Sequence, residues 1–240
     1  MIIAANLKTN LTCHDTTLYI EELEKFVQKS KQEVLVFPAI SSLDNFFTKV
    51  EIGTQNAYPT LNGAFTGEIG IEQLSEFGIK TILIGHSERR HILGESQEFI
   101  AQKFDYFKRE GFKIVYCVGE PKSVREAGRK QMLEYISAQY AGIDTSYEKL
   151  IVAYEPVWAI GTGLTPTFED IEDIHAELKK RSHAPLLYGG SVKVTNAKDV
   201  LALNNVDGIL VGSAALYVEH FCTMIEYADE LENQNNIKGE

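Results

Sequence analysis

Eight short apolar runs alternate with amphipathic segments along the 240 residues of the chain, and this alternation restricts the fold more than any other feature. Because short buried strands separated by helices are typical of parallel βα units, the pattern predicts an α/β fold with a parallel sheet. We expect strands at residues 2–6, 34–37, 51–56, 80–84, 113–118, 150–154, 185–188 and 207–211.

The segments between these strands have helical spacing. Thr167, followed by Glu169 and Asp170, is typical of a capped helix start, and so is Thr195 before Asn196-Ala-Lys. Three expected helix faces are Ile20 with Leu23 and Val27, Ile100 with Phe104 and Phe107, and Ile171 with Ile174 and Leu178.

The segment after the first expected strand distinguishes two arrangements of such a sheet. An open doubly wound sheet that binds a dinucleotide carries a glycine-rich loop there. Here the segment is Asn6-Leu-Lys-Thr-Asn10, which has no glycine, and no long linker or low-complexity stretch divides the chain. We therefore expect a single closed (β/α)8 barrel that forms one domain over residues 1–240, and we keep the open sheet as the alternative.

The net charge of −11 at pH 7 disfavours nucleic acids and anionic membranes as partners. No apolar run approaches the roughly 18 residues of a membrane span, and the N-terminal segment lacks the basic start of a signal peptide. Cys13, Cys117 and Cys222 are odd in number and have no metal-ligand spacing. We therefore expect a reduced, cytoplasmic protein without structural zinc.

Polar residues and glycines follow the expected strands at their carboxyl ends, where barrel enzymes carry their functional groups. They are Asn6, Lys8, Gln55, Asn56, His86, Glu88, Glu120, Glu155, Gly189 to Ser191, and Gly212 with Ser213. Because all these strand ends meet at one rim of a barrel, we expect the chemistry to gather there.

Glu155 lies at the end of a wholly apolar strand, residues 150–154. The apolar residues 157–160 follow, and Gly161 and Gly163 permit unusual backbone angles after them. This composition is typical of a lid over a catalytic base. A buried carboxylate in a structural ion pair explains the same residues equally well, so the segment alone leaves both interpretations open.

Lys8, His86 and Cys117 each have an ordinary structural interpretation beside the functional one. Most lysines are solvated, most buried histidines are structural, and Cys117 within a strand is best explained as a small buried apolar residue. His86 precedes a segment, 87–91, that could begin a helix. The positive end of a helix disfavours the charged imidazole, so we expect a neutral His86.

Two glycine-serine turns follow the last two strands. Gly189-Gly-Ser191 and Gly212-Ser213 are each weak signals, but the loops after strands 7 and 8 form the recurrent phosphate site of such barrels. A short helix expected from Ala214 would point its positive end at that site. The pair therefore predicts a site for a small dianion, and the missing Walker lysine pattern argues against a nucleoside triphosphate.

Taken in order, these segments resemble the triosephosphate isomerase family from the first strand to the last. The resemblance is carried by Ala5 to Lys8, Ala64 to Glu68, Ile84 to Arg90, Tyr116 to Glu120, Ala153 to Gly163, Tyr188 to Val192, and Leu210 to Gly212. It implies a TIM barrel and a cytoplasmic enzyme of glycolysis and gluconeogenesis. Such an enzyme interconverts dihydroxyacetone phosphate and glyceraldehyde 3-phosphate without metal or organic cofactor.

The resemblance also implies a role for each site residue. Glu155 would be the base, and a neutral His86 would polarise the carbonyl. Lys8 and Asn6 would stabilise the negative charge of the enediolate. Supporting positions would be Glu88 and Cys117, and the phosphate would be held by backbone N–H groups of Gly161, Ser191, Gly212 and Ser213.

The family is usually a homodimer, which implies that the loop over residues 56–68 enters a partner, with Thr66 at its tip. The chain departs from the family pattern at Leu7, at Leu164 in the second hinge of the expected lid, and at Ser213. Two other classes stay open: a different phosphate-binding barrel enzyme, such as an aldolase or epimerase, and a barrel that binds a metabolite without catalysis. The first class is disfavoured, because the expected strands offer no Schiff-base lysine near Glu155 for an aldolase and the sequence shows no metal ligands for an epimerase.

Overall fold

The computed structural model describes residues 1–160 and 165–238, and eight parallel strands form one sheet within it. The strands are β1 (Ile2–Asn6), β2 (Glu33–Phe37), β3 (Glu51–Ile52), β4 (Thr81–Ile84), β5 (Lys113–Val118), β6 (Leu150–Tyr154), β7 (Leu186–Tyr188) and β8 (Gly208–Val211). Their order is β3-β2-β1-β8-β7-β6-β5-β4, so the first and last strands of the chain are neighbours. This order is that of a barrel and not of an open doubly wound sheet.

Thr54 joins the two ends of the sheet. It forms an isolated parallel bridge with Ile82 of β4. The Thr54 N–H donates to Thr81 O at 2.9 Å, and the Leu83 N–H donates to Thr54 O at 2.9 Å. The strand expected at 51–56 was therefore too long, because the Thr54 hydroxyl donates to Asn56 O and turns the chain out of the sheet. The predicted closed (β/α)8 barrel is confirmed.

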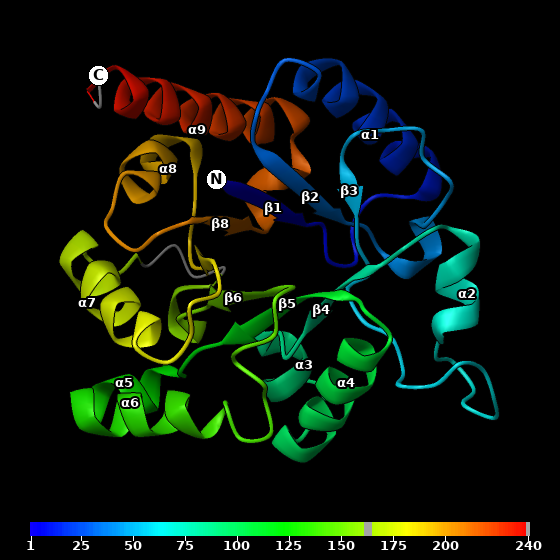
Figure 1. Ribbon diagram of the computed structural model, residues 1–240, viewed down its shortest axis with the longest axis horizontal. Helices are drawn as coiled ribbons and strands as arrows, with labels where there is room; N and C mark the ends of the chain where they lie inside the picture. The colour runs from blue at the N-terminus through cyan, green and yellow to red at the C-terminus, as the bar shows by residue number, and fades with distance from the viewer. Residues whose placement is uncertain (161–164, 239–240) are drawn as a thin grey trace.

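Helices surround the strands, as Figure 1 shows. They are α1 (Cys13–Val27), α2 (Ile71–Glu76), α3 (Ser87–His91), α4 (Gln97–Arg109), α5 (Lys122–Glu126), α6 (Arg129–Ala138), α7 (Phe168–Lys179), α8 (Val194–Leu201) and α9 (Val218–Lys238), with 3-10 turns η1 (Ile40–Ser42), η2 (Val157–Ala159) and η3 (Ser213–Leu216). The three helix faces expected from spacing are buried against the sheet, as predicted. Among the described residues, no helix has both the length and the apolar character that crossing a bilayer requires.

The alternation of strands and helices is interrupted between β2 and β3. Residues 38–50 are all described, and they contain the turn η1 but no α-helix. Glu24 of α1 holds this segment by accepting from the Lys49 N–H at 2.7 Å. Phe47 in the same segment is fully exposed. The alternation of strands and helices that the sequence predicted therefore does not extend to residues 38–50.

The helix starts agree with the sequence in one case and differ in the other. Thr167 caps α7, because its hydroxyl accepts from the Asp170 N–H at 3.1 Å. The start expected at Thr195 was wrong, since α8 already begins at Val194. The Asn196 side chain accepts from the Lys193 N–H at 2.8 Å, and this bond replaces the expected threonine cap.

The inside of the barrel has its own small core, separate from the layer between strands and helices. Ala153 belongs to the inner core and Tyr154 to the outer layer, because successive side chains of a strand point to opposite faces. The next residue, Glu155, therefore points inward at the carboxyl end of β6. The same alternation brings Asn6 inward after Ala4 and Ala5 of β1.

Candidate active site

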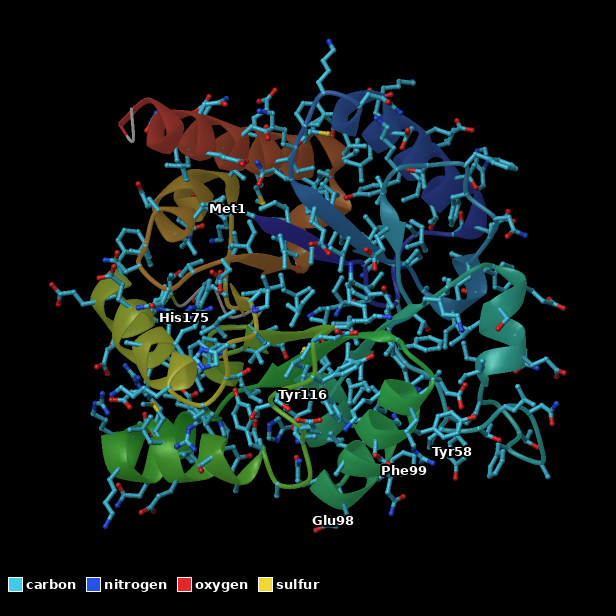
Figure 2. The ribbon with its side chains drawn as sticks, viewed as in Figure 1. Met1, Tyr58, Glu98, Phe99, Tyr116 and His175 are labelled. Atoms are coloured by element: carbon cyan, nitrogen blue, oxygen red, sulfur yellow. The ribbon has the colours of Figure 1, made fainter. Side chains whose placement is uncertain are left out.

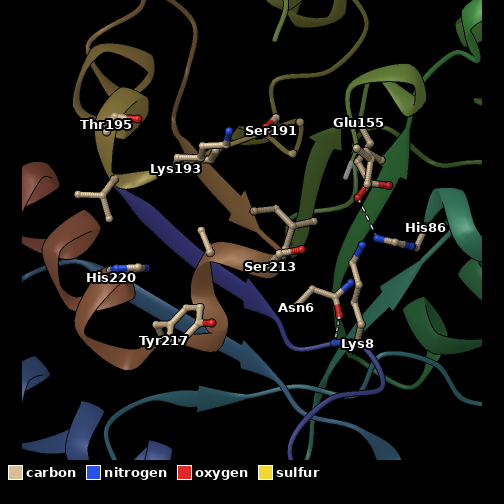
Figure 3. Close-up of a pocket in the computed structure, with 18 residues that line it drawn as sticks. Asn6, Lys8, His86, Glu155, Ser191, Lys193, Thr195, Ser213, Tyr217 and His220 are labelled. Carbon is tan, nitrogen blue, oxygen red and sulfur yellow. Dashed lines mark hydrogen bonds and ion pairs between the residues drawn. The ribbon is translucent and has the colours of Figure 1, made fainter. Parts of the chain in front are cut away.

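A cavity of about 760 Å³ opens at the carboxyl ends of the strands, and Figure 3 shows the side chains that line it. Of the eight residues expected to act in catalysis or to bind the substrate, seven lie on its wall, namely Asn6, Lys8, His86, Glu155, Ser191, Gly212 and Ser213. They come from both ends of the chain and from its middle. Gly161, the remaining expected phosphate ligand, lies outside the described residues, as do the hinge positions Gly163 and Leu164.

Glu155 and His86 face each other across the top of the barrel. Glu155 Oε1 lies 3.1 Å from His86 Nε2, and Glu155 Oε2 accepts from the Ser87 N–H at 3.1 Å. Both side chains are buried. The Glu155 N–H donates to Val118 O at 2.7 Å, which extends the pairing of β5 with β6 to the base of this side chain. The carboxylate is therefore held by two groups, His86 Nε2 and the Ser87 N–H, and its backbone is fixed to β5.

His86 caps the helix α3 with its own ring. Its Nδ1 accepts from the Glu88 N–H at 3.3 Å, so that nitrogen carries no proton and the neutral ring has its proton on Nε2. Burial opposes the charged imidazolium, but the Glu155 carboxylate at Nε2 outweighs burial, and the pKa of His86 is raised above 6.5. The neutral state expected from the helix end is thus opposed chiefly by Glu155, and to a smaller extent by Glu88 at 3.6 Å from Nδ1. If the Glu155 carboxylate turned away, burial and the capping N–H would both favour neutral His86.

The same contacts make Glu155 a weak base in this arrangement. Burial acts to raise the pKa of Glu155, yet His86, the Ser87 N–H and Lys8 stabilise the carboxylate, and the pKa is lowered below 4.5. A carboxylate with so low a pKa has little affinity for a proton. Its strength as a base would increase if it exchanged these partners for an apolar enclosure.

Lys8 approaches the pair from β1. Its backbone has a φ of 53°, and its N–H donates to Asn6 Oδ1 at 3.0 Å. The Gln55 side chain donates to Lys8 O at 2.7 Å and so fixes this unusual conformation. The Lys8 ammonium lies 2.7 Å from Glu88 Oε1. The Glu88 side chain therefore contacts the lysine, and its backbone N–H contacts His86.

Backbone and small side chains form the opposite wall of the cavity. A Cβ on Gly189 would lie 2.9 Å from Glu155 Cγ, and one on Gly212 would lie 3.3 Å from Lys8 Cε. The glycines therefore let the two loops approach the charged side chains closely. The turn η3 begins at Ser213 and α8 begins at Val194, and the first residues of both line the cavity.

The other side chains on the cavity wall include Lys193, Tyr217 and His220, to which the sequence assigned no role in the site. The rings of Tyr217 and His220 are 5.2 Å apart. Lys193 could have been recognised, because it is the cation nearest in sequence to the Ser191 turn. His220 could not, because its position in the cavity depends on where α9 begins.

Glu120 is buried directly beneath the apolar segment that follows Glu155. It accepts from Trp158 Nε1 at 2.9 Å, and the Tyr154 hydroxyl lies 3.2 Å from each of its oxygens. Burial raises the pKa of Glu120. The tryptophan is therefore anchored to a polar group under the barrel rim, although its neighbours in the segment are apolar.

Cys117 and Thr66 lie outside the cavity wall, in different ways. Cys117 is completely buried in the inner core below Glu155, where burial raises the pKa of its thiol. Thr66 is exposed on the loop 56–68. That loop packs on its own chain through Tyr58, which stacks on Phe65 at 4.2 Å and lies 5.7 Å from the Phe99 ring of α4 (Figure 2).

Within residues 1–160 and 165–238, no cluster of three histidine, cysteine or carboxylate groups is placed to hold a metal ion.

Comparison with known proteins gives one family. A family model described as triosephosphate isomerase matches residues 1–228. A triosephosphate isomerase of Sulfurimonas denitrificans is 68% identical over 237 residues, which are 98% of this chain and 99% of that protein. One of a Sulfurovum species is 56% identical over 94% of this chain and 99% of its own length, and one of a Nitratiruptor species is 51% identical over 96% and 100%.

Proposed function

This chain belongs to the triosephosphate isomerase family, and we propose that it interconverts dihydroxyacetone phosphate and D-glyceraldehyde 3-phosphate through an enediolate. The observation that carries the proposal is the meeting of Glu155, His86, Lys8 and two glycine-serine loops around one cavity. The aldolase, epimerase and non-catalytic alternatives are not favoured, because the similar proteins share one name over nearly their full lengths.

The reaction moves a proton between two adjacent carbons, so it requires a base and a donor that address one planar intermediate. Glu155 takes the proton from one carbon and returns it to the neighbouring carbon of the enediolate. His86 donates its Nε2 proton to a substrate oxygen and exchanges protons between the two oxygens of the enediolate. A neutral ring suits this role, because it passes its Nε2 proton to one enediolate oxygen and takes a proton from the other. The single negative charge moves between substrate and ring, and no further charge is added to the buried site.

Lys8 and Asn6 stabilise the charge that develops on the substrate oxygens. The ammonium already lies within 2.7 Å of a carboxylate, so it is ordered before the substrate arrives. Fixed donors of this kind contribute about 10²–10³-fold to rate. General base catalysis adds roughly 10²–10⁴-fold.

The phosphate is assigned to the loops after β7 and β8. Residues of these loops and the starts of α8 and η3 line the cavity, and free N–H groups at helix starts would provide local positive potential in a chain with a net charge of −11. Gly161 remains a proposed ligand from the sequence. The phosphate keeps the same ligands throughout the reaction. Because it is held in one place, the two reacting carbons of the substrate stay in position.

The apolar segment 157–160 supplies the enclosure that a carboxylate base needs. Glu155 must leave His86 and Ser87 to reach a carbon-bound proton, and closure of this segment would then remove water and raise the pKa of the carboxylate. Water exclusion also protects the enediolate from losing its phosphate.

A coupled assay of glyceraldehyde 3-phosphate conversion tests this function. We expect activity in the wild type and at least a hundredfold loss of kcat in Glu155→Asp, because the shorter side chain withdraws the carboxylate by one methylene. Glu148→Asp, an exposed change before β6 at the other end of the barrel, is the matched control. Near-normal turnover in Glu155→Asp would remove the base from the mechanism.

We also propose that the enzyme is a cytoplasmic homodimer in which residues 1–240 act as one domain, with Thr66 inserted into the partner. In support, the loop 56–68 exposes Leu61 and Phe65, which is apolar for a free loop. Sedimentation equilibrium of Thr66→Arg should show dissociation, because a buried charge is costly. Thr66→Ser should stay dimeric, and an intact Thr66→Arg dimer would reject this interface.

A further inference from the structure

The position of Glu155 depends on a close contact with Gly119. After β5 ends at Val118, the Gly119 peptide passes so near to the Glu155 backbone that a Cβ there would lie 1.7 Å from Glu155 O. The Glu155 N–H donates to Val118 O just beside this contact, at 2.7 Å. Any shift of the Gly119 peptide therefore moves the backbone that carries the base.

The Gln139 side chain holds this peptide from behind the sheet. It follows the last turn of α6 and is only 6% exposed. Its Nε2 donates to Gly119 O at 2.7 Å, and its Oε1 accepts from the Gly119 N–H at 2.9 Å. One side-chain amide thus pairs with both polar groups of Gly119, where the regular pairing of β5 has ended.

The backbone of Gln139 is itself fixed by polar side chains. Its carbonyl accepts from Gln97 Nε2 at 2.8 Å and from the Tyr116 hydroxyl. That hydroxyl also accepts from Arg90 at 2.9 Å, and Arg90 Nε donates to Gly85 O at 2.6 Å. Tyr116 lies between the sheet and α4 in Figure 2.

These bonds connect the two backbones that carry the reacting side chains. Gly85 immediately precedes His86, and Gly119 lies against Glu155. The chain of contacts from Gly85 to Gly119 passes through Arg90, Tyr116 and Gln139, all on the outer side of the sheet. None of the described residues in this chain of contacts lines the cavity.

We propose that Gln139 is a positioning residue, which sets the distance between Glu155 and His86 by clamping the Gly119 peptide. The inference rests on the proposed isomerase function and adds a residue that does not touch the substrate. The Gln139 clamp acts on β5 and β6, whereas the phosphate loops follow β7 and β8. Loss of the clamp should therefore lower the rate of proton transfer and leave phosphate binding intact.

The test compares Gln139→Met with Gln32→Met. Methionine keeps the approximate volume of glutamine without its amide. Gln32 is also buried and hydrogen-bonded, to the N-terminus and to Asp229 and Glu232, but it precedes β2 at the opposite end of the barrel. The two variants should lose similar thermal stability.

Only Gln139→Met should lose turnover. We expect kcat for glyceraldehyde 3-phosphate to fall by about 10- to 100-fold, since a displacement near 1 Å in a reacting group has effects of this size. KM and the inhibition constant of inorganic phosphate should stay within twofold of the wild type. Gln32→Met should retain the wild-type kcat.

Several results would overturn the proposal. They are an unchanged kcat in folded Gln139→Met, an equal loss in Gln32→Met, or a parallel weakening of phosphate inhibition, which would indicate general loosening. If Gln139→Met does not fold, Gln139→Asn keeps the amide but shortens its reach, and an unchanged kcat there would count equally against the clamp. An inactive wild type would instead reject the isomerase function itself.

Discussion

The mouth of the barrel and the layer between β7 and α7 each contain one buried histidine, and the pKa values of the two are shifted in opposite directions. His86 in the mouth faces the Glu155 carboxylate, and its pKa is raised. His175 on α7 is wholly buried beside the rings of Tyr154 and Tyr188, and burial lowers its pKa to about 4. Its Nδ1 is 2.9 Å from Asn205 O, and its Nε2 has no hydrogen-bond partner among the described residues.

The difference shows that burial by itself does not decide how a histidine titrates. Both rings are buried to a similar degree, and in both burial favours the neutral form. Among the described residues, carboxylates contact His86 but none contacts His175. The Glu155 carboxylate, 3.1 Å from His86 Nε2, therefore raises the pKa of His86 more than burial lowers it. The reactivity of the mouth thus depends on where Glu155 is placed.

The largest effect should come from removing the histidine of the mouth. We expect His86→Gln to lower kcat by roughly 10²–10⁴-fold, the usual contribution of a positioned proton donor. His175→Phe is the matched change outside the mouth and should leave kcat within twofold of the wild type. Equal losses in the coupled assay would show that His86, too, is only structural.

A smaller effect concerns stability and its dependence on pH. The folded-state pKa of His175 is depressed from 6.5 to about 4, so this group contributes stability above pH 6.5 that is lost as the pH falls towards 4. The expected loss is up to roughly 3 kcal/mol of unfolding free energy. Urea unfolding at pH 8, 6 and 4 should show a shallower decline in His175→Phe than in the wild type. Parallel curves for the two proteins would contradict the assignment.

The smallest effect should come from moving the carboxylate without removing it. In Gly189→Ala the new Cβ would lie 2.9 Å from Glu155 Cγ, so the side chain must shift. We expect about a tenfold lower kcat. Displacing the carboxylate should also lower the pKa of His86 towards that of an isolated buried ring, which NMR titration of the imidazole would detect. A pKa equal to that of the wild type would mean that Glu155 had kept its place.

The sequence was most informative where a pattern is local and repeated. Seven strand positions were predicted from short apolar runs, because a strand that is buried on both faces consists almost entirely of apolar residues. β3 was the exception: its end depends on the Thr54 hydroxyl and on pairing with β4, which no local pattern reveals. The missing helix after β2 and the early start of α8 were likewise decided by contacts with α1 and by the Asn196 side chain.

The candidate site likewise has features that the sequence predicted and features that it could not. Glu155, His86 and Lys8 could be placed on one rim from the sequence, since each follows a strand of a barrel and carboxyl ends of parallel strands must coincide. Their protonation could not, because it depends on distances across the barrel. His220 lies on the cavity wall only because of where α9 begins, which no local pattern reveals.

By itself, the sequence determined the α/β barrel, the rim at which its polar groups gather, and the family. These follow from periodicity and from residue types at fixed spacing, which the chain carries locally. Only the tertiary structure decided that Glu155 rests on His86 with a lowered pKa and that Gln139 clamps Gly119 behind it. Both depend on contacts between residues at least 20 positions apart, and electrostatic and steric energies change steeply over a few tenths of an ångström at such contacts.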